Sequence, residues 1–306
     1  MKKILQMCLL LAATVSLAQT EIDGVMMGKG YLCSGIVYES SSWKEYWEGI
    51  FKRENLNFGI VSAQKVAVNF NYGISKKLNA IVTLPYIATT ASAGTFIGQN
   101  GFQDLSMTLK YMPFEMDFGN KTVAFYVFGG YSLPVTDYVA DYLPLSIGLK
   151  SKIATVRAMG DLQWKNFFTT VSAAYSKRYN IEIDRNTYYT TKMHYTNQVD
   201  MPDAININAR LGYRTQWLIV EAVADTWQTL GETFDITTNN MPFPSNTMNM
   251  TKLGINVKYT FRKLPALALI AGFHHVTSGR NVGQSDTFYG GIFYMVKLKK
   301  NKETKK

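Results

Sequence analysis

The residues best suited to catalysis in this chain are three histidines and one nearby hydroxyl. His274 and His275 are adjacent, Ser278 follows closely, and His194 lies far upstream. A serine hydrolase needs Ser and His within hydrogen-bond reach, but adjacent strand residues point to opposite faces, so only one histidine of the pair could serve. The sequence has no Gly-x-Ser-x-Gly nucleophile motif. The same geometry argues against metal binding by the pair. We therefore predict no catalytic residues, no cofactor and no metal.

The first residues have the pattern of a secretory signal peptide. Met1-Lys2-Lys3 is basic, the stretch 4–15 is apolar, and Ser16-Leu17-Ala18 offers the small residues that precede signal peptidase cleavage. The alternative is a buried N-terminal helix. We predict that residues 1–18 are removed, so that Cys33 is the only cysteine of the exported chain and no internal disulfide can form. Cys33 is then expected to be a small apolar residue and not a nucleophile.

Composition and charge exclude several classes of protein. Hydrophobic residues make up 47% and charged residues 18% of the 306 residues, which excludes intrinsic disorder. The formal net charge of +10 comes largely from Lys2, Lys3 and the tail 297–306, which leaves about +3 for the body of the chain. No basic and aromatic nucleic-acid motif is present, so we predict no nucleic-acid partner. The mean hydropathy of -0.07 shows that polar residues nearly cancel the apolar ones.

The apolar and polar residues alternate one by one. In 104–111, Leu105, Met107, Leu109 and Tyr111 lie on one side and polar residues on the other, and stretches 204–213 and 251–261 repeat this period of two. After the signal peptide, no stretch reaches the ~18 apolar residues of a membrane helix. Strands of about ten residues or more match the length that crosses a bilayer in a tilted barrel. Because only helices and closed barrels satisfy every backbone polar group inside lipid, an exported chain with such strands suggests a barrel.

Turn and loop lengths support the same architecture. Short turns alternate with long polar loops, as in outer-membrane barrels, whose short turns are periplasmic and whose longer loops are extracellular. We predict an all-β, antiparallel, up-and-down transmembrane β-barrel, with a soluble secreted β-sandwich as the alternative. Twelve strands are expected, at 30–38, 64–74, 79–90, 102–113, 121–133, 146–164, 167–183, 203–213, 216–229, 249–261, 266–277 and 286–298. The barrel should occupy 19–298, followed by a basic tail at 299–306.

Two stretches fit this pattern poorly. In 145–164 the apolar parity of Ile147, Leu149 and Ile153 is shared by Arg157 and Asp161, and a β-bulge near Ala154 would repair the phase. Within the N-terminal region 19–63, we expect one strand, followed by residues 39–63 as either a long outer loop or a segment that fills the lumen.

The polar face of the strands should line the lumen. Charges of both signs can pair there away from bulk water, and structural pairing is expected to be their main role. Aromatic side chains in the outer loops could gather an apolar ligand or could stabilise loop packing. The candidates for the lumen are Asp104, Lys110, Arg157, Asp161, Arg178, Glu182, Arg210, Glu221, Asp225, Lys252 and Lys258, and those in the loops are Phe96, Tyr138, Tyr142, Tyr188, Tyr189 and Phe234.

Several strand ends resemble a known family. The stretches Asn71-Tyr72-Gly73-Ile74-Ser75, Leu84-Pro85-Tyr86, Gly101-Phe102-Gln103-Asp104-Leu105 and Leu133-Pro134-Val135-Thr136-Asp137 resemble the outer-membrane transporter family labelled MetA-pathway of phenol degradation, which is similar to FadL-type transporters. Residues 42–49 look like a Bacteroidetes version. The resemblance covers residues 65–180 and implies uptake of aromatic or other hydrophobic molecules. The long N-terminal plug of FadL-type proteins has no counterpart in this sequence.

Together these observations predict an outer-membrane channel that admits small, hydrophobic or aromatic solutes by passive diffusion. About twelve strands give too narrow a bore for the open aqueous channel of 16–18-stranded porins. The expected partners are an apolar small-molecule solute, outer-membrane lipid and the barrel-assembly machinery. The alternative is a non-transporting surface barrel with a role in adhesion or envelope structure.

Overall fold

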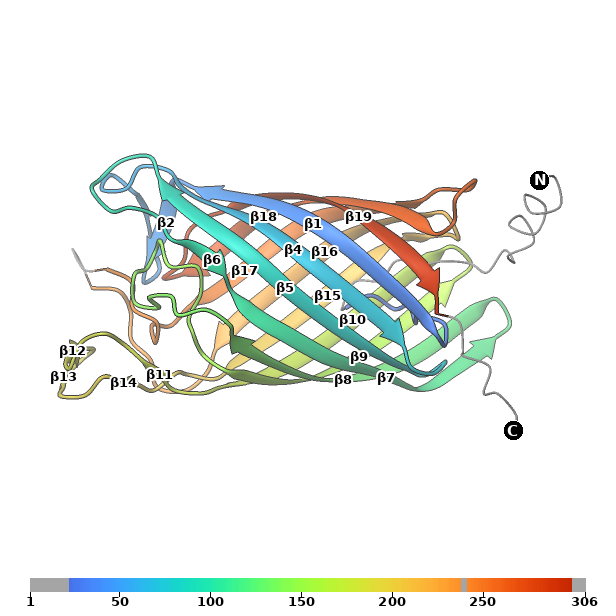
Figure 1. The fold of residues 1–306 in the computed structure, drawn as a ribbon, viewed down its shortest axis with the longest axis horizontal. Coiled ribbons are helices and arrows are strands. Elements are labelled where there is room, and N and C mark those ends of the chain that lie inside the picture. Colours follow the sequence, from blue (N-terminus) through green and yellow to red (C-terminus); the bar gives the residue numbers. More distant parts are fainter. Residues whose placement is uncertain (1–21, 238–240, 299–306) are drawn as a thin grey trace, which may run out of the picture.

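The protein folds into a closed antiparallel β-barrel (Figure 1). The computed structural model describes residues 22–237 and 241–298, so the predicted signal peptide and basic tail lie outside the described residues. Twelve long strands form the wall, which confirms the predicted fold class and strand number. No helix within the described residues is long and apolar enough to cross a membrane.

The wall strands follow one another around the barrel in chain order. They are β1 (Tyr31–Trp43), β4 (Val61–Gly73), β5 (Leu78–Ala91), β7 (Asp104–Phe118), β8 (Lys121–Pro134), β9 (Ile153–Trp164), β10 (Phe167–Arg178), β15 (Ala204–Arg214), β16 (Leu218–Thr229), β17 (Asn249–Thr260), β18 (Leu267–Arg280) and β19 (Asp286–Lys297). The shorter strands are β2 (Glu45–Glu48), β3 (Phe51–Glu54), β6 (Asn100–Phe102), β11 (Ile181–Glu182), β12 (Tyr188–Tyr189), β13 (Met193–His194) and β14 (Gln198–Val199).

The first and last wall strands pair with each other and close the sheet. The β1–β19 register runs from Tyr31 opposite Lys297 to Ser42 opposite Asp286. The even number of strands brings residues 22 and 298 to the same end of the barrel as the short turns, which we call the short-turn end. The opposite, long-loop end carries β2, β3 and β11–β14 (Figure 1).

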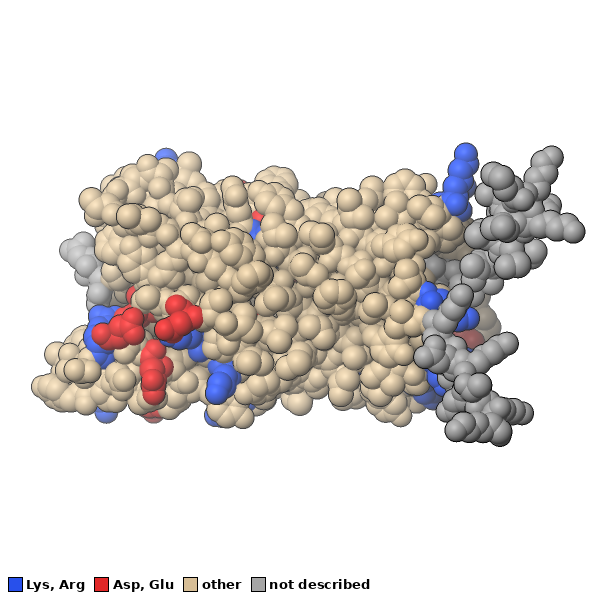
Figure 2. All heavy atoms as spheres, viewed as in Figure 1, with Lys and Arg blue, Asp and Glu red and all other residues tan. Residues whose placement is uncertain are grey.

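Alternation along each strand separates a lipid-type outer surface from a polar interior. On β17, Leu253, Ile255 and Val257 are exposed, whereas Lys258 and Thr260 are buried inside the barrel. The middle of the wall in Figure 2 carries almost no charged atoms, and the charges collect at the two ends. An apolar outer belt on a closed barrel is the surface that a bilayer covers, so this fold is that of an outer-membrane barrel.

The predicted strand at 146–164 is wrong in its first part. β9 begins only at Ile153 and pairs without a register shift with both neighbours, so a bulge near Ala154 is not needed. Of the residues that caused the phase conflict, Ile147 and Leu149 belong to a connecting segment, in which Leu145 and Ile147 are buried, and Ile153 is the first residue of β9. Register irregularities occur instead in β7, between Tyr111 and Phe114, and in β17, between Thr251 and Lys252.

Two further strand boundaries differ from the prediction. β10 ends at Arg178, not at residue 183, and β11 follows as part of the long-loop end. β1 extends to Trp43 instead of stopping near residue 38, and the β2–β3 hairpin follows it. Of the two possibilities for 39–63, residues 44–55 thus form a hairpin at the long-loop end. The part of the N-terminal region that does enter the lumen is residues 22–30, described below.

A charge on the lipid-facing surface is expected to destabilise the barrel. Ile255 lies in the middle of β17 with 58% of its surface exposed. We expect Ile255→Arg to lower the free energy of unfolding in lipid by about 2–4 kcal/mol, because a cation at the bilayer midplane loses its hydration. The measurement is urea unfolding in lipid vesicles, with Thr191→Arg in an exposed loop as control. Equal stability of both variants would contradict a lipid-facing position for Ile255.

Candidate functional site

The lumen is occupied at its short-turn end by the chain's own N-terminal residues. We call residues 22–30 the lumen segment. Lys110 of β7, whose side chain is fully buried, donates from Nζ to the carbonyl oxygens of Asp23 at 2.5 Å and Val25 at 2.8 Å, and it lies 3.2 Å from Asp23 Oδ1. Charged hydrogen bonds of this kind are stronger than neutral ones. One lysine therefore fixes the backbone of the lumen segment to the barrel wall.

Close backbone contact extends this attachment to the neighbouring strands. Tyr126 of β8 donates its hydroxyl proton to Gly24 O at 2.9 Å. A Cβ at Gly24 would lie 2.0 Å from Asp161 Oδ1, so only glycine fits there. Asp161 is itself held by both terminal nitrogens of Arg214, at 2.9 and 3.0 Å. The lumen segment thus rests on a buried ion pair with fixed geometry.

One side of the lumen is filled by paired polar side chains. We call this side, formed by β9, β10, β15 and β16, the paired wall. Arg210 Nη1 lies 2.8 Å from Glu221 Oε1, and the carboxylate of Asp225 accepts from the side-chain amides of Asn206 and Asn208 at 2.7 and 2.9 Å. Arg157 donates to Ser172 Oγ at 2.9 Å and to Asn206 Oδ1 at 3.0 Å. Each carboxylate of this wall has a polar partner, as buried charges require.

The opposite side of the lumen encloses a cavity of about 400 Å³. We call it the mid-lumen cavity, and its lining comes mainly from β1, β4, β5, β18 and β19. Its members include the apolar Val37, Ala67, Ile81 and Ile270 and the polar Asn69, Thr83, Gln103, Lys252 and His274. Glu39 and Lys65 also line it and form an ion pair at 2.7 Å. The paired wall and the cavity face each other across the barrel, and the space beside Arg210 and Glu221 of the paired wall is much smaller, at about 40 Å³.

A connecting segment folds inward across the long-loop end. In residues 135–152, Tyr138 donates its hydroxyl proton to Asp104 Oδ1 at 2.7 Å and accepts from the backbone N–H of Lys150. Burial, followed by the charge of Asp104, raises the pKa of Tyr138 above its ordinary value. The Leu145 carbonyl accepts from Thr89 Oγ1 of β5 at 2.5 Å, and the Leu145 side chain packs with Phe58 and Val61. The segment therefore spans from β8 to β4 and covers the lumen.

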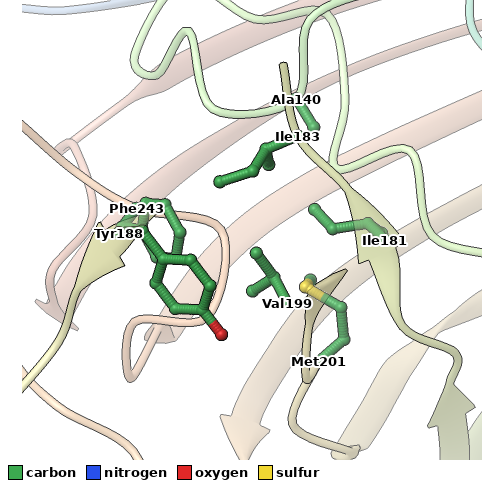
Figure 3. Packing of buried hydrophobic residues seen from close by; sticks show 7 residues of the cluster. All are labelled: Ala140, Ile181, Ile183, Tyr188, Val199, Met201 and Phe243. Atoms are coloured by element: carbon green, nitrogen blue, oxygen red, sulfur yellow. The ribbon is translucent and has the colours of Figure 1, made fainter. Parts of the chain in front are cut away.

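Above this segment lies a second pocket, of about 470 Å³, which we call the mouth pocket. Its lining is rich in aromatic rings and includes Phe96, Tyr142, Tyr188, Tyr189, Phe234 and Phe243. A buried cluster of Ala140, Ile181, Ile183, Tyr188, Val199, Met201 and Phe243 supports it, with Tyr188 stacked on Phe243 at 5.2 Å between ring centroids (Figure 3). Pockets of this size and apolar lining hold small organic molecules.

Asn281 joins three segments around the mouth. Its Oδ1 accepts from the backbone N–H groups of Gly49 at 2.8 Å and Ile236 at 3.0 Å, and its Nδ2 donates to Thr247 O and Asp235 Oδ1. Its φ of 54° lies in the left-handed region, which asparagine tolerates better than most residues. Hydrogen bonds from Arg280 hold the pKa of Asp235 below its ordinary value, so these contacts weaken only when the pH falls through that lowered pKa.

The structure separates the predicted lumen residues into distinct groups. Lys110, Arg157, Asp161, Arg210, Glu221, Asp225, Lys252 and Lys258 point into the barrel, while Asp104 and Arg178 lie near its long-loop end. The prediction for Glu182 is wrong in position, because β10 ends before it and its exposed side chain pairs with Gln198 in the β11–β14 hairpin.

Four charged residues that face the lumen were not among the residues predicted to line it. Glu39 was missed because the first strand was predicted to end at residue 38, whereas β1 extends to Trp43. Lys65 lay within the predicted strand 64–74 but was not included among the lumen candidates. Arg214 was assigned to a turn, although its continued even spacing after Asn206, Asn208 and Arg210 could have revealed it. Asp23 precedes every strand, and no periodic signal marks it.

The loop aromatics and histidines also have defined positions. Five of the six predicted aromatics line the mouth pocket, namely Phe96, Tyr142, Tyr188, Tyr189 and Phe234, whereas Tyr138 is buried beneath it. His274 faces the lumen and His275 faces outward, where it lies 2.6 Å from Asp286 Oδ1. His194 stacks on Tyr188. Among the described residues, no group of three His, Cys, Asp or Glu could hold a metal ion.

Comparison with known proteins supports the fold. No family model matches the chain, so the family resemblance proposed from sequence motifs remains a prediction. No curated protein matches it by sequence. The COG4313 outer membrane channel from Pseudomonas putida F1 is similar in structure, with a TM-score of 0.71 and 9% identity over 92% of this chain and 100% of that chain. The translocator domain of the autotransporter NalP from Neisseria meningitidis is less similar, with a TM-score of 0.45 and 12% identity over 86% and 87%.

Removing the Lys110 ammonium is expected to release the lumen segment. Lys110→Met leaves the carbonyls of Asp23 and Val25 without their charged donor, at a cost of about 1–3 kcal/mol for buried acceptors left unsatisfied. We expect a larger single-channel conductance in planar bilayers than for the unmodified protein. Lys121→Met, at the exposed first residue of β8 at the same end, serves as control. An unchanged conductance for Lys110→Met would show that the segment stays in place without this lysine.

Removing the Asn281 side chain is expected to loosen the mouth. Asn281→Gly keeps the left-handed backbone accessible but deletes the contacts to Gly49, Ile236 and Thr247. We expect amide hydrogen exchange at Gly49 and Ile236 to accelerate by about tenfold or more, the factor for one buried hydrogen bond of ~1.4 kcal/mol. Asn186→Gly, in an exposed bend, is the control. Unchanged protection of these amides from hydrogen exchange would show that other contacts keep the mouth rigid.

Proposed function

We propose that this protein is an outer-membrane channel that admits small, hydrophobic or aromatic solutes by passive diffusion. The observation that carries the proposal is the pair of spaces inside one closed barrel. The aromatic mouth pocket lies at the long-loop end, and the mid-lumen cavity lies in the barrel interior, on the side away from the paired wall. A solute would pass from the first space to the second.

The chemistry of the two spaces supports small and largely apolar solutes. The mouth pocket offers aromatic rings, which bind planar apolar molecules through dispersion and offset stacking. The two pockets, of about 470 and 400 Å³, are suited to small organic molecules and not to polymers. The fold that the chain shares with a protein described as an outer membrane channel supports the same proposal.

The lumen segment and the inward segment 135–152 both narrow the route. Passage past them requires either rearrangement of these segments or a solute small enough to slip beside them. This favours slow, selective entry over the free diffusion that a wide porin allows. A non-transporting surface barrel is the alternative, and it predicts no permeation by any class of solute.

Filling the mid-lumen cavity is expected to block passage. Ala67 faces this cavity from β4, so Ala67→Phe places a ring in the proposed route. In proteoliposomes we expect uptake of a neutral aromatic solute such as benzyl alcohol, measured against protein-free vesicles, to fall several-fold relative to the unmodified protein.

The matched control is Ala173→Phe, which adds the same ring to the lipid-facing side of β10. Equal uptake by both variants would place the route elsewhere. If the unmodified protein gave neither uptake nor ion conductance, the channel proposal would be abandoned in favour of a structural or adhesive barrel.

A further inference from the structure

We infer that the mid-lumen cavity is a binding site for a small amphipathic organic anion, whose carboxylate is recognised by Lys252. The inference deepens the proposed function, because the cavity lies on the proposed route. It names the chemistry of the solute's polar end, which the aromatic mouth pocket alone leaves open.

The first step is the distribution of acidic groups in the lumen. The paired wall holds Asp161, Glu221 and Asp225, and each carboxylate is engaged by arginine or by asparagine amides. The charges of Asp161 and Glu221 are matched by Arg214 and Arg210. Asp225 keeps its charge, because its partners are neutral amides, but Asn206 links it to the Arg157 guanidinium on the same wall. The acid that does line the cavity, Glu39, is neutralised by Lys65 at 2.7 Å.

The second step concerns Lys252. This residue lines the cavity from β17, and no carboxylate oxygen lies within 4.0 Å of its ammonium among the residues that the structure describes. Its register neighbour on β16 is Asp225, but the Asp225 oxygens are occupied by Asn206 and Asn208. With the Glu39–Lys65 pair neutral, Lys252 gives the cavity a net positive charge. A partly desolvated cation with no paired acid favours binding of an anion.

The third step concerns the remainder of the lining. Val37, Ala67, Ile81 and Ile270 provide apolar surface for an organic body. Asn69, Thr83 and Gln103 add neutral hydrogen-bonding groups, which can solvate a carboxylate beside Lys252. The combination fits a molecule with one acidic group and an apolar body, and it fits an inorganic anion poorly because much of the lining would remain unused.

The test uses two probes of the same size that differ in charge, 2-naphthoate and 2-naphthamide. Binding to the full-length barrel purified in uncharged detergent is measured by isothermal titration calorimetry at low and high salt. We expect naphthoate to bind about tenfold more tightly than the amide, as a charged hydrogen bond provides. This preference should decrease at high salt.

Four variants locate the effect. Lys252→Met should abolish the preference for naphthoate, Lys252→Arg should retain most of it, and Lys177→Met, at a lysine paired with Asp203 outside the cavity, should leave it unchanged. Ala67→Phe should weaken binding of both probes because it fills the cavity. The heat-dependent shift of each variant on unboiled gels verifies that it is folded.

Three outcomes overturn the inference: equal affinity of the unmodified protein for both probes, a preference for naphthoate that survives Lys252→Met in a folded barrel, or binding of both probes that is not weakened by Ala67→Phe. Failure of the proposed function is distinguishable, because binding in detergent does not depend on passage. Binding without uptake into proteoliposomes would leave the site intact and remove the channel. Uptake of neutral aromatics without any preference for naphthoate would support the channel and overturn the anion site.

Discussion

The structure depends on the pairing of β1 with β19. Inside a bilayer an unpaired N–H or C=O has no water to bind, so a sheet that crosses it must have no open edge. The long register from Tyr31–Lys297 to Ser42–Asp286 removes both edges at once. Because β1 and β19 pair antiparallel, like every other neighbouring pair of the wall, the number of strands is even and residues 22 and 298 lie at one end. Because the chain enters at that end, residues 22–30 are adjacent to the lumen before the first strand begins.

A closed barrel of twelve strands also has an interior that must be filled. Twelve strands enclose a space wider than the side-chain-filled interior of eight-stranded barrels and narrower than the channel of 16–18-stranded porins. The paired wall fills one side with ion pairs and amides, and segments 22–30 and 135–152 occupy the two ends. The volume left over is the mid-lumen cavity on the β1, β4, β5, β18 and β19 side. The position of the cavity is thus a consequence of where long polar side chains are concentrated in the sequence.

Alternation predicted the wall well because a period of two is a direct consequence of strand geometry. It located the outward Leu253, Ile255 and Val257 and the inward Lys110, Arg210 and Glu221 from the sequence alone. It failed where the chain enters the lumen without forming a strand. Leu145 and Ile147 are buried as a strand's inner face would be, but by an irregular segment, and so the pattern suggested a strand with a bulge. Asp23 was missed for the same reason, since its partner Lys110 lies 87 positions away and only the closed barrel brings them together.

The charged residues illustrate why residue type alone could not identify a site. Arg210 and Lys252 have the same sign and both point inward, yet Arg210 is paired with Glu221 and Lys252 faces the cavity. The difference arises from the strands that flank each residue. β15 lies between β10 and β16, whose inward faces carry hydroxyls and acids. β17 lies between β16 and β18: Asp225 of β16 is opposite Lys252 but accepts from Asn206 and Asn208, and the inward Ile270, Gly272 and His274 of β18 include no acid. A cation on the boundary between the two walls therefore remains directed toward the cavity, and charge selection in the lumen depends on neighbouring strands more than on composition.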